Sequence, residues 1–233
     1  LRPMFYLDPL YFVFMIPAIV FVMFAQYRVK STFQKYSQVQ TNQGVTGAQA
    51  AAEILRSNGI YDVQIERIQG ALSDHYDPRH KVLRLSESVY GSASVAAVGV
   101  AAHESGHALQ HARGYTPLAV RSAIVPVANI GNMLGPIMLI AGIIIGLTQL
   151  AWLGIAFFAA GTLFALVTLP VEFNASSRAM QQLTTLGIFD RTEYEQGKKV
   201  LNAAALTYVA GFAAALLQLL YYISLVSGMR RSD

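Results

Sequence analysis

The chain has 233 residues, of which 54% are hydrophobic and 13% are charged, whereas an average soluble domain carries about 25% charged residues. This composition predicts a membrane protein, and the net charge of +4, scattered along the chain, argues against nucleic acid as a partner. The absence of cysteine excludes disulfides and thiolate metal sites, so a metal would have to be bound by histidine, carboxylate or water.

Four apolar segments are each long enough to cross a bilayer, which needs about 20 residues. They cover approximately residues 10–27, 124–147, 151–169 and 203–226. The first segment lacks the small-residue cleavage site of a signal peptide, so we interpret it as a retained N-terminal anchor. The second and third are separated only by "TQL", which predicts a tight hairpin, and "GNMLG" and "GIIIG" in the second favour close helix packing.

The orientation in the membrane is predicted from the basic residues beside the first span. Three of them follow it: Arg28, Lys30 and Lys35. Because basic flanks favour the cytoplasmic side, residues 28–123 are expected in the cytoplasm, and two further crossings return residues 170–202 to it. Four crossings would leave Arg230 and Arg231 outside, which conflicts with the same rule and leaves the side of the C-terminus open.

The segment between the first two spans begins with a predicted helix, "TGAQAAAEILRSNG", in which Thr46 and Gln49 form a capping box and Asn58-Gly59 stops the helix. Three runs with strand character follow, "DVQIERI", "ALSDHYD" and "KVLRLS". They predict a small sheet of about three antiparallel strands, with the last strands on either side of the turn at Pro78.

The next segment, "SASVAAVGVAAHESGHALQHA", predicts a helix that ends at Gly114, before Pro117. It contains His103, Glu104 and His107 in the pattern His-Glu-x-x-His. Residues four apart lie on the same face of a helix, so both imidazoles can face one ion with the glutamate alongside. This pattern indicates part of a zinc site and its general base. The alternative is a buried alanine-rich helix whose histidines bind backbone or carboxylate groups.

A catalytic zinc usually has three protein ligands, so one more is expected. His111 lies about 12 Å from His103 along the same helix, which is too far for one ion and favours a supporting or surface role. Glu172, expected at the start of a helix just after the third span, is the better candidate. The alternative for Glu172 is an acid that stabilises a helix N-terminus after Pro170. Competing ligands lie in "SDHYDP": Asp74, His75 and Asp77.

Several polar side chains could stabilise the oxyanion that develops during hydrolysis, because cationic and hydroxyl donors suit that task. The candidates are His75, Tyr76 and Arg178. Nothing in the sequence separates them from ordinary structural residues.

With these motifs in place, the sequence resembles the YugP-like neutral zinc metallopeptidases, which are bacterial multi-pass membrane proteins. The resemblance covers nearly the whole chain, through the N-terminal anchor, "SDHYDPRHKVLRLSESVY", "VAAHESGHALQHARGYTPLAVR" and "LPVEFNASSRAM". The chain is more distantly similar to the membrane-embedded gluzincins, namely the heat-shock membrane proteases and the prenyl-protein proteases. There, a glutamate on a later helix is the third zinc ligand, which implies this role for Glu172. Those relatives often carry an acidic residue or asparagine four positions later to orient a histidine; here Ser176 stands there, and Asn174 is a candidate substitute.

The predicted fold is an α-helical membrane protein with about four transmembrane helices and a small α+β, zincin-like cytoplasmic part that carries the His-Glu-x-x-His helix. Five parts are expected: an N-terminal transmembrane anchor (residues 1–27), the cytoplasmic zincin-like part (28–123), a transmembrane hairpin (124–169), cytoplasmic helices with the third ligand (170–202) and a C-terminal transmembrane helix (203–233).

The predicted function is that of a membrane-bound zinc-dependent endopeptidase. One Zn²⁺, bound by His103, His107 and Glu172, would activate a water, with Glu104 as the general base. The resemblance implies the bacterial cell membrane as the location, and the basic residues after the first span predict that the active site is on the cytoplasmic side. The expected partners are the lipid bilayer and a protein or peptide substrate, including membrane-associated ones; a substrate strand could add to the edge of the small sheet. No regulatory partner is indicated.

Two other functions are compatible with parts of the sequence. One is a catalytically inactive membrane scaffold or assembly factor that retains a zinc site, against which an intact Glu104 argues. The other is a zinc transporter, which would need ligands in the middle of the membrane. The four spans contain Asn129 and Asn132 but no histidine, aspartate or glutamate, so this is the least favoured function.

Overall fold

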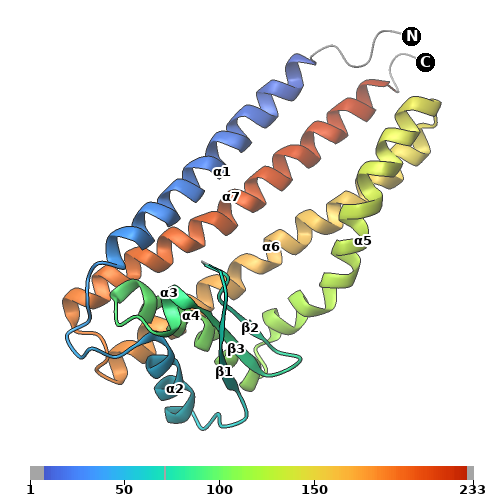
Figure 1. The fold of residues 1–233 in the computed structure, drawn as a ribbon. Helices are drawn as coiled ribbons and strands as arrows, with labels where there is room; N and C mark the ends of the chain where they lie inside the picture. Colours follow the sequence, from blue (N-terminus) through green and yellow to red (C-terminus); the bar gives the residue numbers. More distant parts are fainter. Residues whose placement is uncertain (1–7, 71, 230–233) are drawn as a thin grey trace. The chain divides into compact units, whose positions relative to one another are not determined.

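The computed structural model describes residues 8–70 and 72–229, and Figure 1 shows their helices and strands. Arg230 and Arg231, which bear on the predicted topology, lie outside the described residues. The chain divides into two compact units. The apolar unit comprises Leu1–Ala25, Val120–Leu169 and Thr207–Asp233, and the motif unit comprises Gln26–Ala119 and Pro170–Leu206.

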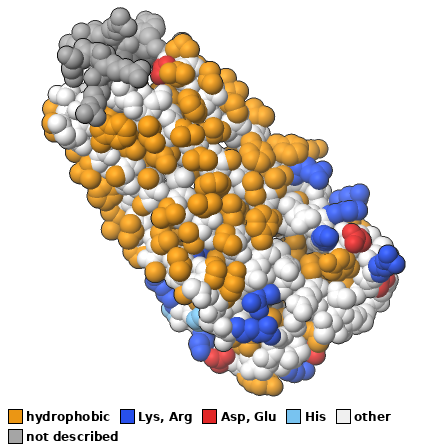
Figure 2. Space-filling model, turned by 180° about the vertical axis from the view of Figure 1, so that it is seen from behind, with side chains coloured by type: hydrophobic (Ala, Val, Ile, Leu, Met, Phe, Trp, Pro, Cys, Tyr) orange, Lys and Arg blue, Asp and Glu red, His pale blue; other side chains and the backbone are white. Residues whose placement is uncertain are grey.

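Among the described residues, four helices are long and apolar enough to cross a membrane, as the sequence predicts. They are α1 (Pro9–Tyr36), α5 (Thr116–Ile145), α6 (Thr148–Thr185) and α7 (Arg191–Met229). Large hydrophobic side chains on these helices are widely exposed, for example Val13 at 65% and Ile145 at 71%. Figure 2 shows a broad surface of such side chains with few charges in it. Exposed apolar surface of this extent is expected to face lipid.

Helices α5 and α6 form the expected hairpin within the apolar unit. Gly131, Gly135 and Gly142 of α5 lie directly against the backbone of α6, and a Cβ atom at any of them would collide with it. Gly146, with φ +78°, lies between the two helices in the left-handed region that favours glycine. The small residues therefore set both the turn and the close approach of the two helices.

Helix α6 corrects one expectation about the site. It runs without interruption from Thr148 to Thr185 with Pro170 inside it, so no new helix begins before Glu172. A proline lacks the backbone N–H of one helical hydrogen bond, but long membrane helices tolerate the loss because neighbouring groups compensate. Glu172 is thus an interior residue of a helix, and the interpretation of it as an acid at a helix N-terminus is wrong.

The motif unit begins with α2 (Gly47–Ser57), where the predicted capping box between Thr46 and Gln49 is confirmed. The sheet comprises β1 (Gln64–Ile68), β2 (His75–Asp77) and β3 (Val82–Ser86), in the order β1-β3-β2. As predicted, β2 and β3 are antiparallel on either side of the turn at Pro78.

The prediction of a wholly antiparallel sheet is wrong for β1, which is parallel to β3. Because β3 lies between β1 and β2, the chain passes from one edge of the sheet to the other after β1, and these two consecutive strands form no hairpin.

The short helix α3 (Glu87–Tyr90) leads to the motif helix α4 (Val95–Ala112). Ser94 caps the start of α4 by accepting a hydrogen bond from the Ala97 amide, and Gly114, with φ +61°, follows its end as predicted. Helix α4 packs in the core with α2 and the sheet, and most of its residues are buried. This burial holds the backbone that carries the two histidines.

Candidate metal centre

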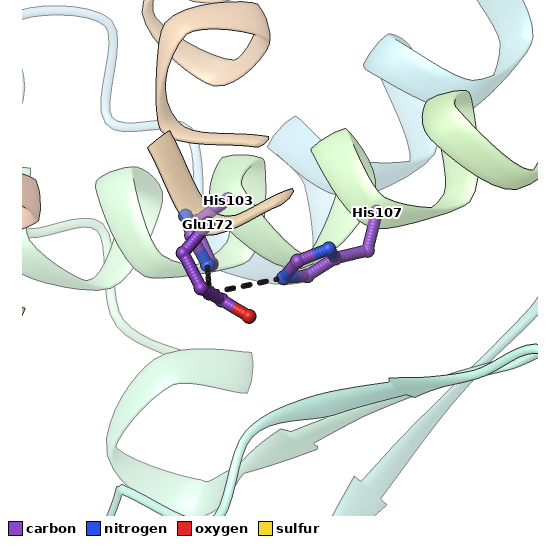
Figure 3. A group of neighbouring side chains, drawn as sticks. All are labelled: His103, His107 and Glu172. Atoms are coloured by element: carbon purple, nitrogen blue, oxygen red, sulfur yellow. Dashed lines mark hydrogen bonds and ion pairs between the residues drawn. The ribbon is translucent and has the colours of Figure 1, made fainter. Parts of the chain in front are cut away.

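Three side chains of the motif unit converge on one point, two from α4 and one from α6 (Figure 3). His103 and His107 lie one helical turn apart, and their ring centroids are 4.8 Å apart. The Oε2 atom of Glu172 lies 3.2 Å from Nε2 of His103 and 3.4 Å from Nε2 of His107. One ligand atom from each residue lies within 4.8 Å of the others, so the three could bind a single metal ion.

The glycine of the motif allows α6 to approach α4. A Cβ atom on Gly106 would lie 2.5 Å from the carbonyl oxygen of Ala175 and 3.2 Å from its Cα, so only glycine fits between the two backbones. Ala175 lies three residues after Glu172, whose side chain is almost completely buried. This close packing brings the carboxylate of one helix to the imidazoles of the other.

Both imidazoles have a hydrogen-bond partner on the nitrogen that faces away from Glu172. Nδ1 of His103 lies 3.0 Å from Oγ of Ser176, and Nδ1 of His107 lies 3.0 Å from Oε1 of Gln110. Such partners orient metal-binding histidines and leave the opposite nitrogen for the metal. Ser176 thus contacts a histidine from the position where the gluzincins often have an acid or asparagine.

Gln110 is a residue that the sequence interpretation missed. It lies three residues after His107, and therefore on a neighbouring position of the same helix face. That spacing was the available signal for a contact with the ring. Gln110 is fully buried, which is uncommon for a glutamine and requires that its amide be hydrogen-bonded.

The carboxylates affect the protonation of the buried histidine. Burial alone would lower the pKa of His107, but the hydrogen bond that its ring donates to Glu172 and the charges of Glu104 and Glu172 raise the pKa above its usual value. A metal must displace this proton, because a histidine binds metal only through an unprotonated nitrogen. Glu104 is buried on α4 next to His103 in the sequence, and its charge acts on the imidazole of His107.

The donor set suits zinc better than a harder ion. Two imidazole nitrogens and one carboxylate oxygen form the ligand set of several catalytic zinc sites, whereas Mg²⁺ and Ca²⁺ prefer oxygen ligands throughout. Three protein ligands also leave a coordination position for water or substrate. The arrangement is therefore chemically suited to activating a water molecule.

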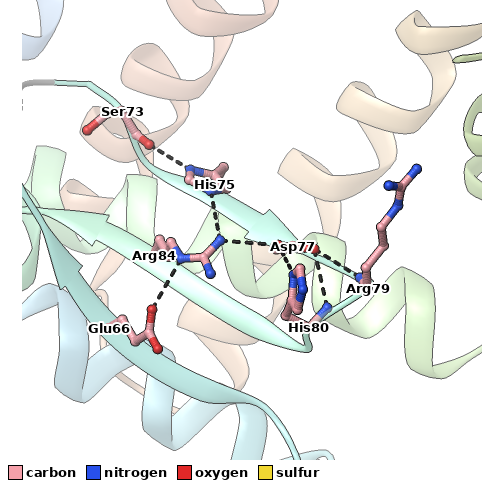
Figure 4. Close-up of polar contacts among 7 residues, drawn as sticks. All are labelled: Glu66, Ser73, His75, Asp77, Arg79, His80 and Arg84. Atoms are coloured by element: carbon pink, nitrogen blue, oxygen red, sulfur yellow. Dashed lines mark hydrogen bonds and ion pairs between the residues drawn. The ribbon is translucent and has the colours of Figure 1, made fainter.

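Several other predicted residues lie in a separate polar network on the sheet and its turn (Figure 4). Nδ1 of His75 contacts the backbone carbonyl of Ser73, and its Nε2 atom lies 3.5 Å from Nη1 of Arg84. Asp77 accepts hydrogen bonds from His80 and Arg84, and the bond from His80 contributes most to holding its pKa below the usual range. These contacts stabilise the turn, and neither His75 nor Asp77 belongs to the group of three potential ligands found among the described residues.

Asp74 and the pair formed by Tyr76 and His111 also have partners of their own. Asp74 accepts bonds from the amide and hydroxyl of Ser86, and burial raises the pKa of its carboxyl. The Tyr76 hydroxyl lies 2.8 Å from Nδ1 of His111, and burial raises the tyrosine pKa to about 12. His111 is outside the group of three potential ligands, as its distance along the helix predicts.

Asn174 and Arg178 connect to the group through Gln110. Oδ1 of Asn174 accepts hydrogen bonds from Nε2 of Gln110 at 3.0 Å and from Nε of Arg178 at 2.7 Å. The guanidinium of Arg178 also lies over the ring of Tyr115, 5.6 Å from its centroid. Both residues are therefore connected to His107 through the hydrogen bonds of Gln110.

A groove of about 860 Å³ lies within the motif unit, between α6 and α7. Phe173, Met180 and Leu201 contribute apolar surface to it, and Lys198 contributes charge. Ser176, which contacts His103, also lines this groove, so one of its walls adjoins the group of three potential ligands.

Comparisons with known proteins found a matching family and a similar protein. Residues 11–227 match the model of a family described as "Putative neutral zinc metallopeptidase". The chain is 47% identical over 213 residues to the "Putative membrane protease YugP" of Bacillus subtilis (strain 168), covering 91% of this chain and 95% of that protein. No solved structure matches the chain.

Proposed function

This chain belongs to the neutral zinc metallopeptidase family, and we propose that it is a membrane-bound zinc-dependent endopeptidase whose metal is held by His103, His107 and Glu172. The observation that carries the proposal is the convergence of these three side chains from two helices, with the glutamate of the motif buried beside them. The motif unit would then be the zincin-like part expected from the sequence.

In the proposed mechanism the protein residues have distinct roles. Zinc, when bound, would polarise the scissile carbonyl and lower the pKa of a bound water toward about 7. Glu104 would act as the general base that accepts a proton from the attacking water and returns it to the leaving amine. Ser176 and Gln110 hold the two imidazoles in the orientation that directs Nε2 at the metal position.

The substrate is proposed to be a polypeptide bound in extended form. Strand β2 is an edge of the sheet and contacts α4, the helix with the motif. An extended peptide can add to such an edge through main-chain hydrogen bonds and so be held beside the scissile position. Tyr76, on β2, is the retained candidate for stabilising the oxyanion, because its hydroxyl is a donor.

The proposed location is the cell membrane, with the motif unit on the cytoplasmic side. The four candidate spans and the basic residues that follow the first apolar segment support this orientation. With this orientation, we propose the same five parts that the sequence predicts. They are an N-terminal anchor (1–27), the cytoplasmic part with the motif (28–123), a transmembrane hairpin (124–169), cytoplasmic helices (170–202) and a C-terminal transmembrane helix (203–233).

The proposal is tested on the full chain purified in detergent without added metal. Zinc content is measured by mass spectrometry, and cleavage of an unfolded protein substrate is followed with and without a chelator. We expect about one zinc per chain, and cleavage that stops with the chelator and returns with zinc. A chain that contains no zinc, takes none up and shows no chelator-sensitive cleavage would contradict the proposal and favour an inactive scaffold.

A further inference from the structure

The amide of Gln110 links the two helices that carry the potential ligands. Its Oε1 atom lies 3.0 Å from Nδ1 of His107 on α4. Its Nε2 atom donates to the backbone carbonyl of Val171 at 2.8 Å and to Oδ1 of Asn174 at 3.0 Å, both on α6. Val171 immediately precedes Glu172, so one buried side chain contacts a histidine ligand and the backbone beside the carboxylate ligand.

The partners of this amide fix its orientation. The carbonyl of Val171 can only accept a hydrogen bond, so the NH₂ group of Gln110 must point toward α6. Asn174 gives the same answer, because its atom near Gln110 also accepts from Nε of Arg178. A guanidinium can only donate, so this atom of Asn174 is its oxygen, and the NH₂ group of Gln110 must point toward it. The oxygen of Gln110 is therefore the atom that faces His107.

The orientation of the amide in turn determines which nitrogen of His107 carries a proton. An amide oxygen can only accept, so Nδ1 of His107 must be the donor. Nε2, which points toward Glu172, is then the nitrogen that can lose its proton and bind a metal. The hydrogen bonds thus converge on Asn174: His107 donates to Gln110, Gln110 donates to Oδ1 of Asn174, and Arg178 donates to the same oxygen.

We propose that Gln110 is a positioning residue that keeps Nδ1 of His107 protonated and Nε2 directed at the metal position, with Val171 and Asn174 fixing its amide. That Gln110 accepts a hydrogen bond from His107 follows from the observed contacts alone. That this bond strengthens metal binding rests on the function proposed above. Loss of a group that orients a metal-binding histidine typically weakens metal binding by about 10- to 100-fold.

The test replaces Gln110 by methionine, which is similar in length but cannot accept the bond, and by glutamate, which can. The full chain is labelled with ¹⁵N-histidine and studied metal-free in detergent, where the Nδ1–H proton of His107 is followed by NMR. We expect a signal protected from exchange in the wild type and in Gln110→Glu, and its loss in Gln110→Met. Zinc affinity, measured by competition with a chromophoric chelator, should fall about 10- to 100-fold in Gln110→Met and less in Gln110→Glu.

Ser105→Ala is the matched control, because Ser105 is also fully buried on α4 but its hydroxyl donates to the backbone carbonyl of Ala101 in its own helix. It should keep both the Nδ1–H signal and the zinc affinity. A Gln110→Met chain with an unchanged signal and unchanged affinity would overturn the inference. If that variant does not fold, loss of the signal in Gln110→Glu would overturn it equally. A wild type that binds no zinc contradicts the proposed function, while the NMR signal still decides the role of Gln110.

Discussion

Gly106 of α4 lies directly against Ala175 of α6, so that a Cβ atom on the glycine would come within 2.5 Å of the alanine carbonyl oxygen. Neither backbone can move without changing the distance between the histidines and Glu172. The glycine inside the motif is thus part of the geometry of the potential metal centre.

The substitution Gly106→Ala should therefore weaken zinc binding. The added methyl group must push α6 away from α4, and overpacking of this kind typically costs about 1–3 kcal/mol in the free energy of unfolding. Zinc affinity and thermal unfolding of the detergent-solubilised chain measure the two effects. Gly99→Ala is the control on the same helix, because a Cβ atom there meets nothing within 4 Å. Equal zinc affinity in the two variants would show that the close approach is not needed.

Replacement of Ser176 by alanine should also lower zinc affinity, by about 10- to 100-fold, because Nδ1 of His103 loses the hydroxyl that orients it. Ser177→Ala provides the control, since Ser177 lines the same groove but is exposed and is not the partner of His103. Both affinities are read by chelator competition. If Ser176→Ala bound zinc as tightly as Ser177→Ala, the orienting role of Ser176 would have to be abandoned.

A pH-dependent effect is expected at Asp77, whose pKa is held below its ordinary value of 3.8, mainly by the hydrogen bond from His80. A carboxyl with a lowered folded-state pKa contributes stability above its unfolded pKa and loses it as the pH falls through the folded value. The melting temperature of Asp77→Asn should therefore be below that of the wild type at pH 7. The difference should shrink as the pH falls below about 4. If the difference in melting temperature stayed constant across this pH range, the lowered pKa of Asp77 could not be its cause.

The proposed topology can be tested with single cysteines, because the chain has none of its own. Tyr61, 81% exposed in the motif unit, is replaced by cysteine in one variant, and Leu147, between α5 and α6, in another. In intact cells a membrane-impermeant maleimide should label Leu147→Cys, and it should label Tyr61→Cys only after the cells are permeabilised. The reverse pattern would place the motif unit outside the cytoplasm.

Much of the fold could be predicted because its signals are local. The capping box at Thr46 and Gln49 and the glycine stop at Gly114 depend on residues within one or two helical turns. The four apolar segments are recognised by length and composition alone. By contrast, the parallel pairing of β1 with β3 depends on which strands meet in space, and turn residues do not report that.

The candidate site divides in the same way. The spacing of His103 and His107 indicates a shared face from the sequence alone, and the place of Glu172 just after the third span, together with the family resemblance, made it the expected third ligand. The bonds of Gln110 to Val171 and Asn174 span 61 and 64 residues, so no periodicity could reveal them. The contact of Gly106 with Ala175 is likewise a property of two packed helices rather than of either sequence.

The most direct test of the central claim compares two conservative changes, Glu172→Gln and Glu104→Gln, by zinc content and by peptide cleavage of the same preparations. Glu172→Gln should lose most of the zinc and the activity together, because a neutral amide is a much weaker ligand than a carboxylate. Glu104→Gln should keep the zinc, because its three ligands remain, while cleavage falls by about 10²- to 10⁴-fold, as expected for loss of a general base. Full zinc and activity in Glu172→Gln, or normal cleavage by Glu104→Gln, would contradict the account.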